Sequence, residues 1–482
     1  MRATMKRFIA FFFVIIMVTS GTISCDDSSL SDENTGSPQD QTGTMQPQGD
    51  DQDQINQTED GGDNPQIDSN GEDNEDHATI QTTSSLAQSS LARQLSPAVN
   101  EAYLDELVSG NTVFAFDMYQ QLAKEEGNLF FSPHSISLAL AMTYAGARNE
   151  TEDQMADTLS FTLAQENLHP AFNQLDLLLA SRGQDSEGQD GEPFRLNIAN
   201  AIWGQHGYEF RAPFLDILKQ NYGAGLRLLD FISAPDESRT IINDWVSDQT
   251  EEKINDLLQE GTVTRDTRLV LTNAIYFNAA WKSQFEEELT KDAEFTLLDD
   301  SQVTVPMMSQ TDHLKYFDGD GFEAIELPYD GDEISMLILL PNPGEFEELQ
   351  NSLDADELAS TIDELQYTNV SLKMPKFENE CSFSLRDKLS AMGMPIAFSA
   401  AADFSGMHTP SDLFISNVIH KAFVSVDESG TEAAAATAVI MELTAIPEPP
   451  IEVAIDRPFV YSIQDNETGA ILFLGRVLDP SI

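Results

Sequence analysis

Cysteine is almost absent from this chain of 482 residues, which contains only Cys25 and Cys381. Two cysteines cannot build a scaffold of several disulfides or supply a cysteine-rich zinc site. Cys25 lies in the N-terminal segment, where it is interpreted below as a lipidation site, so Cys381 has no partner. Cys381 is therefore expected to be a small apolar packing residue. The fold must therefore rest on its hydrophobic core, and 41% hydrophobic content is enough to bury a large one.

Basic residues are also scarce, since 25 Lys and Arg stand against 82 Asp and Glu, giving a formal net charge of −57. We expect no nucleic-acid partner and no basic patch of the heparin-binding type, because both need a positive surface. A charge this large costs self-repulsion at low ionic strength and is better tolerated in salt. It fits a salt-adapted source and, equally, an ordinary acidic secreted protein.

Apolar runs of membrane-spanning length are missing too. The run Phe8–Val18 follows a basic head but is too short to cross a bilayer, so residues 1–24 are predicted to be an export signal. The sequence TISC ending at Cys25 is similar to a bacterial lipoprotein processing site, although Thr22 stands where leucine is usual. We expect an extracellular protein, lipid-anchored at the cell surface through Cys25. Simple secretion with cleavage nearby is the alternative.

Aromatic residues are absent between residues 26 and 100, where 16 acidic residues accompany one basic residue. Such a segment cannot bury enough apolar surface to fold. Residues 25–100 are therefore predicted to be a lipid-anchored, acidic, disordered tether, with a root-mean-square span of roughly 50 Å. The folded domain is expected to cover residues 101–482.

Signatures of catalysis are missing as well. The seven histidines form no H-E-x-x-H zinc motif, and no G-x-S-x-G nucleophile motif occurs. The stretch Asp318–Gly321 resembles a fragment of a calcium loop, but the remaining ligands are absent, so a turn is expected. A hydrolase that uses Ser132 or His420 is the enzymatic alternative. We expect no catalytic residue, no metal and no cofactor.

What the chain does contain is a change of pattern from helices to strands. Asn111 and Thr151 are expected to cap helices, and Ser132 followed by proline combines a cap with a favoured first turn. Apolar runs of strand length come later, as at Leu269–Phe277 and Ile471–Val477. Early helices and later strands predict an α+β fold with large antiparallel or mixed sheets.

The stretch Glu428–Ile440 reads ESGTEAAAATAVI and is the most informative in the chain. Its four consecutive alanines favour a helix, but small residues also suit a strand buried on both faces. Three prolines soon follow, at Pro447, Pro449 and Pro450, and they forbid a continuing helix. The composition is that of a small-residue hinge leading into an exposed loop.

Five longer blocks carry a family resemblance, and they occur in family order. They are Asn128–Met155 (NLFFSPHSISLALAMTYAGARNETEDQM), Thr272–Phe285 (TNAIYFNAAWKSQF), Met374–Met394 (MPKFENECSFSLRDKLSAMGM), Asp412–Ala438 (DLFISNVIHKAFVSVDESGTEAAAATA) and Arg457–Pro480 (RPFVYSIQDNETGAILFLGRVLDP). The chain resembles the serpins, a family of serine protease inhibitors. The resemblance implies three β-sheets surrounded by eight to nine helices, with an exposed reactive loop.

The resemblance also implies roles for individual residues. The shutter beneath the central sheet matches Ser132, Ser135, Asn273 and His420. The breach, where insertion begins, matches Trp281 and Tyr329. The hinge of the loop matches Glu428, Gly430, Thr431, Ala433, Ala435 and Thr437. The family spacing from Glu428 places the reactive bond at Thr444–Ala445, and a shift of one residue makes Leu443 the reactive residue.

These residues imply a suicide-type inhibitor that acts by loop cleavage and insertion. Its partner is a serine protease, held as a covalent acyl complex, and we expect the inhibitor to be a monomer. The small residues around Thr444 favour elastase-like or subtilisin-like targets, whereas Leu443 suits a chymotrypsin-like one. The alternative is a non-inhibitory serpin that acts as a surface binding module. The hinge favours inhibition, because Glu432 is the one charged residue between positions 431 and 438.

Overall fold

The computed structural model describes residues 84–183, 195–410, 412–431 and 449–482. The helices in these ranges are α1 (Glu101–Leu122), α2 (Pro133–Tyr144), α3 (Asn149–Thr158), α4 (Gln165–Leu179), α5 (Ala212–Tyr222), α6 (Pro235–Gln249), α7 (Phe346–Ser352), α8 (Ala355–Glu364) and α9 (Arg386–Met392), with the 3₁₀ helices η1 (Glu287–Leu289) and η2 (Pro395–Phe398). The strands are β1 (Ser85–Ala87), β2 (Leu129–Phe131), β3 (Arg195–Gln205), β4 (Leu226–Leu229), β5 (Leu269–Ala280), β6 (Lys291–Thr296), β7 (Gln302–Asp318), β8 (Phe322–Pro328), β9 (Ile334–Pro341), β10 (Gln366–Pro375), β11 (Phe377–Ser384), β12 (Asn417–Val426), β13 (Gly430–Thr431), β14 (Ile451–Ala454), β15 (Phe459–Asp465) and β16 (Ile471–Val477). The predicted α+β class is confirmed, and the nine α-helices of the described ranges agree with the expected eight to nine.

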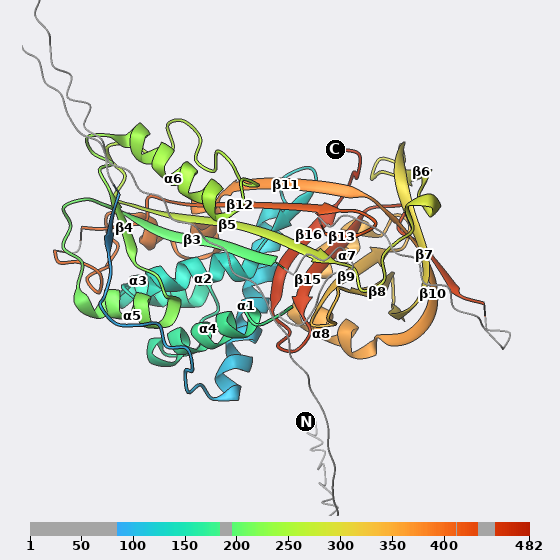
Figure 1. Cartoon of the computed structure of the whole chain (residues 1–482), viewed down its shortest axis with the longest axis horizontal. Coiled ribbons are helices and arrows are strands. Elements are labelled where there is room, and N and C mark those ends of the chain that lie inside the picture. The colour runs from blue at the N-terminus through green and yellow to red at the C-terminus, as the bar shows by residue number, and fades with distance from the viewer. Residues whose placement is uncertain (1–83, 184–194, 411, 432–448) are drawn as a thin grey trace, which may run out of the picture. The chain divides into compact units, whose positions relative to one another are not determined.

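A seven-stranded sheet has helices such as α2 and α4 on one face and α6 on the other (Figure 1). Its strand order is β1-β4-β3-β5-β13-β12-β11. Strand β5 is buried along its whole length, and its alternate residues face opposite sides. Leu271 and Ile275 join the main core, which includes α2, whereas Val270 and Ala274 join a second apolar cluster with Ile242 of α6. The sheet is therefore covered on both faces.

The second sheet has nine strands, in the order β14-β10-β7-β8-β9-β15-β16-β2, with β6 paired to β7. Strand β7 is 17 residues long and pairs with β6 near its start, with β10 along its middle and with β8 near its end. We expected three sheets, but the described residues form two. The reason is that the unbroken β7 carries hydrogen bonds across what would otherwise be the border between two separate sheets.

The fold begins before the expected boundary at residue 101. Strand β1 pairs antiparallel with β4 and forms an edge of the seven-stranded sheet. Arg93 then donates from Nε to Oδ1 of Asn173 at 2.9 Å and forms an ion pair with Asp176 of α4. Residues 84–100 therefore belong to the domain, and the predicted tether of residues 25–100 is too long. Its remaining part, like the export signal, lies outside the described residues.

Of the three predicted helix caps, Ser132 is confirmed and the other two lie inside helices. Ser132 caps α2 as predicted, because its side chain accepts the backbone N–H of the third residue after it. Asn111 lies instead inside α1, where its Oδ1 accepts from Oγ of Ser137 at 2.7 Å. Thr151 is buried inside α3, where its Oγ1 accepts from the backbone N–H of Asp403 at 2.8 Å. Asn111 and Thr151 resemble caps in sequence, but they form tertiary hydrogen bonds.

Candidate functional site

Two neighbouring strands at the centre of the seven-stranded sheet run parallel to each other. Strands β5 and β12 pair over seven positions, from Asn417 opposite Val270 to Phe423 opposite Tyr276. We call this line of pairing the seam. Above it the two strands no longer pair directly, because β13 lies between them.

Strand β13 occupies the top of the seam and is antiparallel to both neighbours. Gly430 pairs with Ala280, and Thr431 pairs with Ala279 on one side and with Val426 on the other. Gly430 has a φ of +154°, and a Cβ at this position would lie 2.2 Å from the carbonyl oxygen of Ala279. A glycine is required here, because any side chain would push the strand out of the gap.

Trp281 and Tyr329 close the entrance above β13. Their rings are stacked with centroids 4.5 Å apart, and the two residues form an isolated β-bridge. Trp281 donates from Nε1 to the carbonyl oxygen of Asp427 at 3.0 Å, and the hydroxyl of Tyr329 lies 2.9 Å from Oγ1 of Thr431. Burial raises the pKa of the Tyr329 phenol, which keeps it neutral. The backbone N–H of Trp281 also donates to the carbonyl oxygen of Ser429 at 2.9 Å, so both predicted breach residues contact the segment Glu428–Thr431 directly.

Glu428 fixes the base of the hinge. Its carboxylate forms an ion pair with Lys376 at 2.7 Å and accepts a hydrogen bond from Oγ1 of Thr290 at 2.7 Å. Burial acts to raise the pKa of this carboxyl, but Lys376 and Thr290 outweigh it, and the pKa lies below its ordinary value. Glu428 is therefore ionised near neutral pH. It ties β12 to the loop before β6 and to the start of β11.

The four predicted shutter residues lie together beneath the seam, all fully buried. Asn273 of β5 donates from Nδ2 to Oγ of Ser135 at 2.6 Å, and its Oδ1 lies against Nδ1 of His420 of β12. Nε2 of His420 accepts the backbone N–H of Ser132 at 3.2 Å. Asn273 and His420 are also directly opposite each other in the seam. This hydrogen-bonded chain therefore joins the two strands to the start of α2.

The sequence prediction missed a fifth member of this network. Asn200 of β3 donates from Nδ2 to the backbone carbonyl of Ser135 at 3.1 Å and also contacts the Asn273 amide. It lies opposite Asn273 in the pairing of β3 with β5. Its one sequence signal is an asparagine within a strand otherwise rich in apolar residues. The register that aligns the two asparagines could not be read from the chain.

The network fixes the tautomer and charge of His420. Nε2 accepts a hydrogen bond, so the ring proton must lie on Nδ1, where it is donated to Asn273. Burial lowers the pKa of His420 to about 3, and a second proton on Nε2 would face the N–H of Ser132. The histidine is therefore neutral at physiological pH. Oγ of Ser132 is buried and accepts a hydrogen bond from a backbone N–H. Ser132 and His420 therefore do not present a nucleophile to a substrate.

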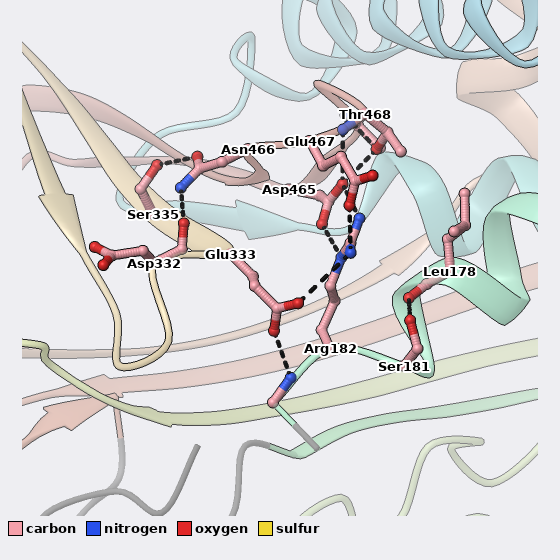
Figure 2. A network of polar contacts seen from close by, with 12 residues as sticks. Leu178, Ser181, Arg182, Asp332, Glu333, Ser335, Asp465, Asn466, Glu467 and Thr468 are labelled. Atoms are coloured by element: carbon pink, nitrogen blue, oxygen red, sulfur yellow. Dashed lines mark hydrogen bonds and ion pairs between the residues drawn. The ribbon is translucent and has the colours of Figure 1, made fainter. Parts of the chain in front are cut away.

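A buried ion pair at some distance from the seam also escaped the sequence prediction. Figure 2 shows Arg182, just after α4, reaching between two turns of the nine-stranded sheet. Its guanidinium contacts both oxygens of Asp465, at 2.6 and 3.2 Å, and lies 2.6 Å from Glu467 and 3.6 Å from Glu333. Asp465 also accepts from the backbone N–H and the hydroxyl of Thr468, at 2.8 and 2.6 Å. Arg182 therefore locks the β8–β9 and β15–β16 turns together.

The remaining predicted site residues cannot be placed, because they lie outside the described residues. They are Cys25, Ala433, Ala435, Thr437, Leu443, Thr444 and Ala445. Within the described ranges, no helix is long and apolar enough to cross a membrane. The same ranges contain no group of three or more His, Cys, Asp or Glu residues that could hold a metal ion.

A covered central sheet with a hinge strand lodged at the top of a parallel seam defines the class to which this molecule belongs. The family model for serpins, described as serine protease inhibitors, matches residues 109–480. The chain belongs to the serpin family.

Individual relatives agree with this assignment. The chain is 41% identical to an uncharacterised serpin-like protein of Thermococcus kodakarensis, over 78% of this chain and 86% of the relative. It is 40% identical to the leukocyte elastase inhibitor of Xenopus laevis, over 78% of this chain and all of the relative. The crystal structure of a thermophilic serpin, tengpin, in the native state superposes with a TM-score of 0.72 at 27% identity, covering 83% of this chain and all of that one.

Proposed function

We propose that this protein inhibits serine proteases by a suicide mechanism, in which the loop after β13 is cut and then enters the seam. The observation that carries the proposal is the position of Gly430–Thr431, already paired between β5 and β12. The chain that follows needs only to continue in the same direction. It would then run antiparallel to both neighbours as a new central strand.

The energetics of such a step are favourable. Insertion gives up the seven direct pairs of the seam and gains a ladder on each side of the new strand. On the order of 10 additional hydrogen bonds at about 1 kcal/mol each would supply about 10 kcal/mol. This is comparable to the whole stability of an ordinary domain. It is enough to drag and distort a protease that remains joined to the loop as an acyl-enzyme.

The target class follows from the expected reactive bond, Thr444–Ala445. No Lys or Arg lies between residues 428 and 452, which disfavours trypsin-like enzymes. Small residues suit the shallow specificity pockets of elastase-like and subtilisin-like proteases, and the name of the Xenopus laevis relative, leukocyte elastase inhibitor, is consistent with this choice. Leu443 would instead suit a chymotrypsin-like enzyme.

Incubation with a small panel of proteases tests the mechanism. We expect a complex that resists SDS with an elastase-like or subtilisin-like enzyme, and none with trypsin. The mass of the released C-terminal peptide should locate the cut after Thr444, within residues 442–446. Complete turnover of the loop without any stable complex would contradict inhibition and favour a non-inhibitory binding module.

We propose further that the protein acts at the outer surface of the cell as a lipid-anchored monomer. The basic head, the short apolar run and Cys25 motivate the anchor. The Cys25→Ser variant should move from the membrane fraction to the soluble fraction, whereas the wild type should remain with membranes. Equal partitioning of the two proteins would show that Cys25 carries no lipid.

A further inference from the structure

A cavity of about 350 Å³ lies beside the ends of β6 and β9, away from the seam. Its walls come from three connections that are distant in the sequence: the β6–β7 turn, the β9–α7 turn and the link from β14 to β15. None of the described residues that line it belongs to β5, β12 or β13. A cavity of this size can hold a small organic molecule.

Backbone hydrogen bonds fix the three walls relative to one another. The N–H of Thr296, at the end of β6, donates to the carbonyl oxygen of Asp456 in the link at 2.8 Å. Nε of Arg457, also in the link, donates to the carbonyl oxygen of Pro341 at the end of β9 at 2.7 Å. A ligand would therefore enter a site whose walls are already ordered, which lowers the entropic cost of binding.

Part of the cavity surface is apolar. Pro341, Phe346 and Pro458 line it and are buried in the protein on their other sides. Leu298, in the β6–β7 turn, also lines it and is 51% exposed. An apolar group placed in the cavity would remove this leucine from water, which favours binding.

The charged residues of the cavity leave a negative surplus. Arg457 is compensated, because it forms ion pairs with Asp456 at 3.0 Å and with Glu323 at 3.7 Å. Asp300 and Glu347 also line the cavity, and both are exposed. In the part of the chain that the structure describes, neither of these two carboxylates forms an ion pair. A cation that enters the cavity would give them a partner.

We propose that this cavity binds a small organic cation, a primary amine attached to an apolar ring or chain. The apolar body would lie against Leu298 and Phe346, and the ammonium would pair with Asp300 or Glu347. An organic anion would meet the same carboxylates with the wrong sign of charge. A bare metal ion is disfavoured, because the described residues contain no group of three or more His, Cys, Asp or Glu that could hold one. The site is separate from the seam and does not depend on protease inhibition.

Calorimetric titration of the intact protein with 4-phenylbutylamine tests the site. We expect saturable binding of one molecule per chain, with a dissociation constant of about 1 mM or less. The alcohol 4-phenylbutan-1-ol has the same apolar body without the charge and should bind about tenfold more weakly. Low ionic strength suits both titrations, because the rim carboxylates are then least screened.

Two double variants that remove the same amount of charge locate the binding. Asp300→Asn with Glu347→Gln should weaken binding of the amine about tenfold. Asparagine suits position 300, because the backbone there has a φ of +65°. Asp363→Asn with Glu364→Gln changes two exposed residues at the end of α8 that do not line the cavity, so this variant should bind like the wild type.

Three results would overturn the proposal. The first is equal weakening by the two double variants, which would mean that the amine is attracted to the acidic surface in general. The second is equal affinity for the amine and the alcohol, which would mean that charge plays no part. The third is the absence of saturable binding at millimolar amine.

Discussion

The seam and the β15–β16 turn hold their strands together with different chemistry. Beneath the seam the polar groups are neutral. Asn273 donates a hydrogen bond to Ser135, His420 accepts one from Ser132, and Asn273 and His420 are hydrogen-bonded to each other. At the β15–β16 turn a buried carboxylate, Asp465, meets Arg182 through two contacts. A neutral hydrogen bond contributes about 1 kcal/mol, whereas removing one partner of a buried ion pair costs about 3–5 kcal/mol. Neutral groups lie where strands are proposed to part, and a charged pair lies where they remain paired.

The largest effect is expected at the β15–β16 turn, where the buried ion pair of Arg182 with Asp465 lies. Asp465→Ala should lower the free energy of unfolding by about 3–5 kcal/mol, because Arg182 loses its fully buried partner. Glu467→Ala is the matched control, since that side chain is 68% exposed and should matter by less than about 1 kcal/mol. Urea unfolding of both variants measures the difference. Similar losses in the two would mean that burial does not set the strength of this cluster.

The next largest effect is expected at the seam, where the loop is proposed to insert. Thr437→Arg would place a charge on the face of the inserted strand that turns inward, which costs several kcal/mol. Loop insertion should become slower than hydrolysis of the acyl-enzyme, so most of the inhibitor is cleaved and released. The stoichiometry of inhibition should therefore rise roughly tenfold while the fold stays intact. Glu432→Arg alters the opposite face and should do far less. One-to-one trapping by Thr437→Arg would show that strand insertion is not the mechanism.

Acid should weaken the seam through its neutral histidine. The folded-state pKa of His420 is lowered to about 3, below the ordinary value of 6.5, so the unfolded chain binds more protons between these limits. Stability from this group is complete above pH 6.5 and is lost as pH falls towards about 3. His420→Gln should therefore reduce the slope of unfolding free energy with pH by up to about 1.4 kcal/mol per unit. Unfolding of both proteins at several pH values between 4 and 7 gives the slopes, and identical slopes would contradict the assignment.

The smallest effect concerns the entrance to the seam. Tyr329→Phe keeps the stack on Trp281 and removes the hydroxyl beside Thr431. We expect a loss of about 1 kcal/mol in unfolding free energy. Tyr367→Phe is the control, because that ring is 69% exposed. A loss from Tyr329→Phe no larger than that of the control would mean that the hydroxyl does not hold the hinge.

The sequence predicted those parts of the structure that depend on local signals or on family motifs. The serine cap at Ser132 and the strand Ile471–Val477 both occur as predicted. Asn111 was misplaced because the same side chain can cap a helix or bind Ser137 across the core, and only the fold decides between them. Strand β1 was missed because it is only three residues long, and its partner β4 lies far along the chain.

The residues of the candidate site also fall into those that a sequence motif predicts and those that only the folded structure brings together. Asn273 and His420 could be predicted because each lies within a motif of the family. The contact of Asn200 with Ser135 and that of Arg182 with Asp465 could not, because each joins residues 65 or 283 positions apart through packing alone. No periodicity or composition connects such pairs. They follow from the register of strands and from the place where a connecting segment crosses a sheet.

Strand β1 gives this molecule a defined point of mechanical attachment. The chain before residue 84 enters the domain there, so any pull on that segment reaches the fold first through the three residue pairs of β1 with β4. The hydrogen bond of Ser89 to Asp216 and then the ion pair of Arg93 with Asp176 come next along the chain. Strand β1 lies at the edge of the sheet, away from the seven pairs of the seam. Under tension β1 would peel off first and absorb the extension, and the seam would bear no load until that edge had given way.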